Sequence, residues 1–164
     1  AVVCRTDNAS VTYYMDSNGQ YELEAADRAA VQAAMNNEYA PTDLTVTYDS
    51  TPVFTGAGET DVVYQEGDNI PDNAMGITWC DDAVDGTLYS CDQQFIRIRG
   101  SGAYNVIRAC HETGHAVGLL HGGNASPTVP NMDSRLGCMR TPTGSITDAG
   151  HLGGNQVWQI NNGY

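Results

Sequence analysis

One stretch of the chain concentrates residue types that together can perform chemistry. Residues 110–121 read CHETGHAVGLLH and contain three of the four histidines in the protein. His111 and His115 are four residues apart, so on a helix they lie on one face, one turn apart. Two imidazoles in this arrangement can bind one metal ion. Glu112 follows the first of them and can reach a water on that ion without being a ligand itself.

A third ligand is expected just beyond the helix. Gly118 can adopt a positive φ at little steric cost, so it is expected to end the helix and turn the chain. The turn would bring His121 to the metal from another direction. Structural zinc sites have four protein ligands, whereas catalytic sites have three and leave a position for water. The three histidines therefore predict one catalytic zinc ion.

The chemistry expected of such a site is hydrolysis of an amide bond. Zinc lowers the pKa of its bound water from 15.7 toward about 7. Glu112 is expected to act as the general base that takes the proton of this water, and then to pass it to the leaving nitrogen. This predicts a zinc-dependent endopeptidase that acts on proteins or peptides. Two alternatives remain open: hydrolysis of a non-protein amide or cell-wall peptide, and a zinc-binding module without catalysis.

The motif resembles a known family. HETGHAVGLLH is similar to the signature of the metzincin metallopeptidases, and this resemblance implies a methionine turn beneath the zinc. Met139, in GCMRT, is the preferred residue, and Met132, in PNMDS, is the alternative. The chain length and the HETGH core also resemble the small secreted snapalysin-like neutral proteases. Those enzymes have aspartate as the third zinc ligand, where this chain has His121.

The comparison with this family shows one departure and has one further implication. Some metzincins have a tyrosine two residues after the methionine, and this chain has Thr141 there. Residues 76–79 would be the edge strand that lines the substrate cleft. An extended peptide can add to such an edge through backbone hydrogen bonds, which requires no particular peptide sequence.

Hydrophobic periodicity and turn residues predict the elements that position these residues. Five strands are expected, at residues 9–16, 42–48, 60–65, 75–80 and 93–99. Helices are expected at residues 21–39 and 104–120, with a short final helix at 154–161. The predicted fold class is α+β, a metzincin-like domain with a twisted mixed five-stranded sheet, an active-site helix and a loop-rich C-terminal part. Residues 1–164 would form one catalytic domain, with subdomains of about 1–120 and 121–164.

The net charge of the chain limits the classes of molecule that it is expected to bind. The chain has 20 acidic residues and seven basic ones, and all seven are arginine, for a net charge of −13. This charge argues against nucleic acid or an anionic membrane surface as a partner. No apolar run approaches the roughly 18 to 20 residues that a membrane helix needs. The expected protein is a monomer.

Five cysteines in so short a chain predict disulfides and a secreted, extracellular protein; the alternative is an intracellular protein with five free thiols. Cys80 and Cys91 enclose a short polar loop and are expected to pair. Cys4, Cys110 and Cys138 remain, and any two of them could pair. The same loop contains Asp81, Asp82 and Asp85, which makes calcium binding a weaker expectation.

Overall fold

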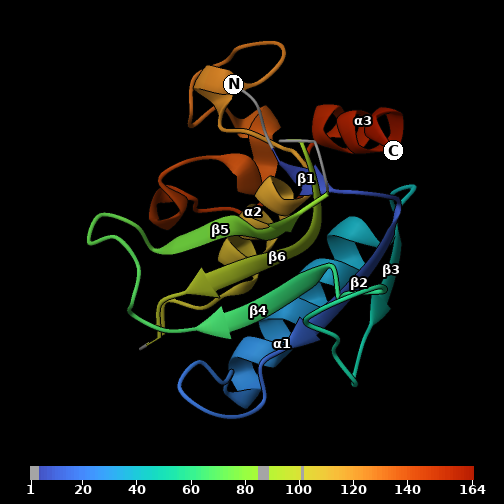
Figure 1. The fold of residues 1–164 in the computed structure, drawn as a ribbon. Coiled ribbons are helices and arrows are strands. Elements are labelled where there is room, and N and C mark those ends of the chain that lie inside the picture. The colour runs from blue at the N-terminus through green and yellow to red at the C-terminus, as the bar shows by residue number, and fades with distance from the viewer. Residues whose placement is uncertain (1–3, 85–88, 101) are drawn as a thin grey trace.

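The computed structural model describes residues 4–84, 89–100 and 102–164. Its centre is a mixed six-stranded sheet with the order β1–β6–β4–β2–β3, and β5 also pairs with β6 (Figure 1). The strands are β1 (Arg5–Thr6), β2 (Ser10–Met15), β3 (Thr45–Tyr48), β4 (Val62–Glu66), β5 (Gly76–Ala83) and β6 (Ser90–Ile98). All pairings are parallel except that of β5 with β6, which is antiparallel.

The prediction of five strands is corrected to six. The five expected strands correspond to β2 through β6, with ends displaced by a few residues. The additional strand, β1, has only two residues and pairs with the start of β6. A segment this short shows no alternation of apolar and polar side chains, so hydrophobic periodicity could not identify it.

In the part of the chain that the structure describes, three α-helices accompany the sheet: α1 (Ala25–Ala34), α2 (Val106–Ala116) and α3 (Gly154–Gly163). The first predicted helix begins four residues later than expected, and its last part, Met35–Tyr39, is a π-helical turn, η1. Short 3₁₀ turns at Gly122–Asn124, Ser134–Met139 and Thr143–Ser145 lie in the expected loop-rich region. Within the described ranges, no helix has the length and apolar character needed to span a membrane.

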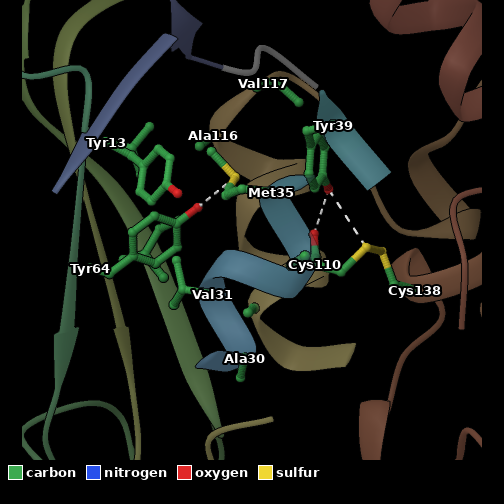
Figure 2. Close-up of a cluster of buried hydrophobic side chains, with 14 of the residues drawn as sticks. Tyr13, Ala30, Val31, Met35, Tyr39, Tyr64, Cys110, Ala116, Val117 and Cys138 are labelled. Atoms are coloured by element: carbon green, nitrogen blue, oxygen red, sulfur yellow. Dashed lines mark hydrogen bonds between the residues drawn. A yellow bond between two sulfur atoms is a disulfide. The ribbon is translucent and has the colours of Figure 1, made fainter. Parts of the chain in front are cut away.

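The core lies between one face of the sheet and the helices α1 and α2 (Figure 2). Tyr64 of β4 is fully buried, and its hydroxyl contacts both Met35 Sδ, at 3.2 Å, and Thr113 Oγ1 of α2, at 2.6 Å. At the end of η1, the hydroxyl of Tyr39 donates to the carbonyl of Cys110 at 2.5 Å. Two buried tyrosines thus fix α2, the helix that carries the HETGH motif, against the sheet and against the turn that follows α1.

Two disulfides cross-link the chain. Cys80 and Cys91 are bonded as predicted, and they join β5 to β6. The second bond joins Cys110 to Cys138 and ties α2 to the C-terminal region, which leaves Cys4 as the free thiol. The sequence left this second pairing open, because three cysteines at unrelated positions give no reason to favour one pair.

Candidate metal centre

The local sequence explains how α2 begins and ends. Asn105 caps the helix, because its side-chain oxygen accepts a hydrogen bond from the backbone N–H of Arg108 at 2.9 Å. At the other end Gly118 has φ of 96°. The N–H of Leu119 bonds back to the carbonyl of Gly114, and that of Gly118 bonds to the carbonyl of His115. This pair of bonds is a Schellman motif, so the expected glycine turn is present.

The turn brings the three predicted histidine ligands together. The Nε2 atoms of His111 and His121 are 3.0 Å apart, and each of the two lies close to Nε2 of His115, at 3.2 Å in both cases. A tetrahedral ion with zinc–nitrogen bonds of about 2.0–2.1 Å would separate its nitrogen ligands by about 3.3 Å. The spacing of the three nitrogens therefore fits one small metal ion.

The tautomers of two histidines follow from their other ring nitrogens. His111 Nδ1 lies 2.7 Å from the carbonyl oxygen of Cys138, and His115 Nδ1 lies 2.9 Å from that of Leu119. A carbonyl oxygen only accepts, so each Nδ1 carries the proton and each Nε2 presents a lone pair. Lone pairs this close together repel one another unless a cation lies between them. The chemistry of the site therefore fits a bound metal ion.

Burial keeps these ligands neutral. His111 is 4% exposed, and desolvation lowers its pKa to about 3, with a further contribution from the charge of His115. Burial also lowers the pKa values of His115 and His121. Neutral imidazole is the form that binds metal, so the fold holds all three histidines ready to act as ligands near neutral pH.

Glu112 is held by β5. Its side chain is 7% exposed, and burial raises its pKa to about 7, against the opposing effect of a hydrogen bond from Thr78. The Thr78 hydroxyl lies 2.7 Å from Glu112 Oε2 and 3.0 Å from the Glu112 carbonyl. Gly76 packs on the other carboxylate oxygen, since a Cβ at this glycine would lie 3.0 Å from Oε1. The sequence placed Thr78 in the expected cleft-lining strand but did not indicate its contact with Glu112, because that contact depends on sheet pairing.

Met139 and Met132 lie in different environments. Met139 is fully buried, and its sulfur occupies the space that a side chain at Gly114 would need. Gly114 lies directly before His115, so this methionine packs beneath the metal-binding helix. Met132 is 39% exposed. The methionine turn stays a prediction, and of the two candidates Met139 is the one that packs beneath the helix.

The histidines open onto a cleft of about 540 Å³. The segment 73–78, which includes the first residues of β5, lines this cleft, and so does the segment 141–144. Arg108 also lines this cleft, one turn before Glu112 on α2. Its guanidinium bonds to Thr143 Oγ1 and to the Ala103 carbonyl, and no described carboxylate forms an ion pair with it. Arg108 was not among the residues predicted from the sequence, although its spacing from His111 places it on the same side of the helix.

The predicted calcium loop lies apart from the histidines. Asp81 and Asp82 are exposed at the end of β5, and Asp85 lies outside the described residues. Calcium binding at this loop therefore stays a prediction.

Comparison of the chain with models of known protein families and with curated protein sequences found no match.

Proposed function

We propose that the protein is a zinc-dependent endopeptidase of metzincin type. The observation that carries this proposal is the convergence of three histidine Nε2 atoms beside a buried glutamate in an open cleft. His111, His115 and His121 would hold the ion. A site with three protein ligands leaves a position for water or substrate, as catalytic zinc sites do.

When bound, zinc would act as a Lewis acid toward the scissile carbonyl and would make a water molecule acidic enough to serve as the nucleophile. Glu112 supplies the proton transfers. Its Oε2 is oriented by the Thr78 hydroxyl, and its raised pKa of about 7 suits a group that first accepts a proton and then donates it. In this role Glu112 takes a proton from the attacking water and delivers it to the leaving nitrogen.

The wall formed by β5 would bind the substrate backbone. Among the described strands, β5 pairs only with β6, so its other edge has unpaired backbone groups. Gly76, Ile77 and Thr78 of this strand line the cleft. An extended peptide placed along them would gain hydrogen bonds that do not depend on its side chains. This favours a protein or peptide as the substrate.

Two disulfides are compatible with a secreted protein, and we propose that the enzyme acts outside the cell.

The deciding experiment compares wild type with Glu112→Gln, an isosteric replacement, on an unstructured protein substrate, and measures zinc in both. We expect wild type to bind one zinc and cleave, and a chelator to abolish cleavage. The variant should keep its zinc and lose about 10²–10⁴-fold in rate.

The alternatives predict different results. A wild type that holds zinc but cleaves no peptide would point to a non-protein amide as substrate. A variant as active as wild type would remove Glu112 from the mechanism. Absence of zinc from wild type would remove the proposed metal.

A further inference from the structure

Three carboxylates meet on the side of the domain where α1 begins. Glu24 is the residue before α1, Asp27 lies in the first turn of this helix, and Glu66 ends β4. One oxygen from each lies within 4.8 Å of the other two. The group therefore joins the first helix to the central sheet, and none of its members belongs to the histidine site.

Buried oxygens in this group accept no hydrogen bond from a protein donor. Asp27 is 7% exposed, and no N–H or hydroxyl group of the described residues donates to its Oδ2; the same holds for the buried Oε2 of Glu66. None of the three carboxylates takes part in the ion pairs formed by the described residues. A buried carboxylate oxygen without a donor carries a large desolvation cost, so these oxygens require either a shared proton or a bound cation.

The surroundings of the three carboxylates suit a cation. A cavity of about 420 Å³ adjoins two of them, Glu24 and Glu66, and its lining also includes residues 67–69, Gly100 and Gly102. At Gly100 a Cβ would lie 2.6 Å from Glu66 Oε1, so the absence of a side chain keeps this oxygen accessible. The helix dipole of α1 favours Glu24 and Asp27 as anions but supplies no partner for Asp27 Oδ2.

The geometry points to a calcium site formed by Glu24, Asp27 and Glu66. Calcium binds six to eight oxygen ligands in flexible geometry, and the site has only oxygen ligands. The exposed Glu24 and the adjoining cavity leave room for the water molecules and backbone carbonyls that would complete the coordination shell. Magnesium requires a stricter octahedron and keeps most of its water, so it should bind more weakly.

In the absence of an ion, a shared proton could relieve the repulsion. A hydrogen bond with Asp27 raises the pKa of Glu66 to about 7, and burial adds to the effect. Calcium would compete with that proton. The two occupants can be separated experimentally, because only calcium binding depends on the calcium concentration.

The test is thermal unfolding of the zinc-loaded protein at pH 7.5 in calcium-free buffer, with CaCl₂ added up to 10 mM and MgCl₂ in parallel. At a calcium concentration of about 100 times Kd, we expect the Tm of wild type to rise by about 5–10 °C. Asp27→Asn and Glu66→Gln, both isosteric, should remove most of the rise. The double variant Asp81→Asn/Asp82→Asn, in the exposed loop, should keep it.

Three results would overturn the site: no rise in wild type, an equal rise with magnesium, or a full rise in both isosteric variants. A second measurement needs no variant. Terbium should bind wild type with one-to-one stoichiometry and emit when excited through Tyr21, which lines the same cavity. Calcium should displace it; emission that calcium cannot displace, or no emission at all, contradicts the proposal.

Discussion

The Nδ1–H of His111 donates to the carbonyl of Cys138, and a disulfide links Cys138 to Cys110, the residue that precedes His111. The disulfide that joins α2 to the C-terminal region therefore also holds the carbonyl that orients the first metal ligand. Hydrogen-bond partners of metal-binding histidines fix the ring and its tautomer, and their loss typically lowers metal affinity by 10–100-fold.

Removal of this disulfide should weaken metal binding as well as the fold. In Cys110→Ser/Cys138→Ser the carbonyl remains in the chain, but the cross-link that holds it against His111 is lost. We expect zinc affinity to fall by about 10–100-fold, measured by competition with a chelator, and the free energy of unfolding to fall by about 3 kcal/mol in urea. As a control, Cys80→Ser/Cys91→Ser should lose stability with zinc affinity unchanged. Equal zinc affinities in all three proteins would contradict the prediction.

Packing beneath the helix should distinguish the two candidate methionines. Met139→Ala removes a fully buried side chain under Gly114 and should lower the free energy of unfolding by about 2–5 kcal/mol. Met132→Ala changes a partly exposed side chain and should have an effect within about 0.5 kcal/mol. Denaturant unfolding of the zinc-loaded proteins measures both. Similar losses in the two variants would show that the burial of Met139 has no special importance.

Arg108 should select acidic substrates. It lines the cleft and has no carboxylate partner among the described residues. A glutamate near the scissile bond would supply one, so peptides with glutamate should be cleaved with a kcat/KM about tenfold above matched peptides with glutamine. Arg108→Gln should abolish this preference and still cleave the glutamine peptides, whereas Arg108→Lys should retain part of it. A preference that survives in Arg108→Gln would exclude this role.

Asp61 should make stability depend on pH. Burial raises its pKa to about 6, although two hydrogen bonds from Thr12, at 2.8 and 2.9 Å, act in the opposite direction. The native state thus holds this proton more tightly than the unfolded chain. The resulting stability is present in full below about pH 3.8, the ordinary value, and is lost as the pH rises through about 6.

In Asp61→Asn this pH dependence disappears. Between pH 4 and pH 7.5, the free energy of unfolding of wild type should fall by about 1 kcal/mol relative to the variant, a figure reduced for partial solvent screening. Urea unfolding of both proteins at the two pH values measures the difference. Asp43→Asn, at an exposed position, controls for the loss of one charge. A constant difference between wild type and Asp61→Asn would show that Asp61 does not titrate in this range.

Most of what could be predicted about the site came from the spacing of residues that are close together in the sequence. The spacing of His111, His115 and His121 fixed their order around a helix and a glycine turn, and their Nε2 atoms do converge. The contact between Thr78 and Glu112 could not be found in this way. Thr78 reaches Glu112 only because β5 pairs with β6 and α2 lies against that sheet, and such contacts between distant segments leave no mark in the local sequence.

The same distinction, between local sequence and contacts of distant segments, explains which elements of the fold could be predicted. The longer strands could be predicted from their β-branched and aromatic residues and from the turn residues that bound them. The two-residue β1 instead depends on its pairing with β6 for its conformation. The π-helical turn Met35–Tyr39 continues α1 directly and lies inside the single helix predicted for residues 21–39. Its geometry is coupled to tertiary contacts, such as that of Tyr39 with the carbonyl of Cys110, and not to helix propensity.

The free edge of β5 also bears on how the protein behaves in concentrated solution. Two copies could pair through this edge and so block each other's cleft, which is the usual hazard of an unprotected edge strand. The C-terminal half of β5, however, is interrupted by a bulge between Cys80 and Asp82 and carries the exposed Asp81 and Asp82. With a net charge of −13, approaching copies repel one another. Salt screens that repulsion, so colloidal stability should decline as ionic strength rises.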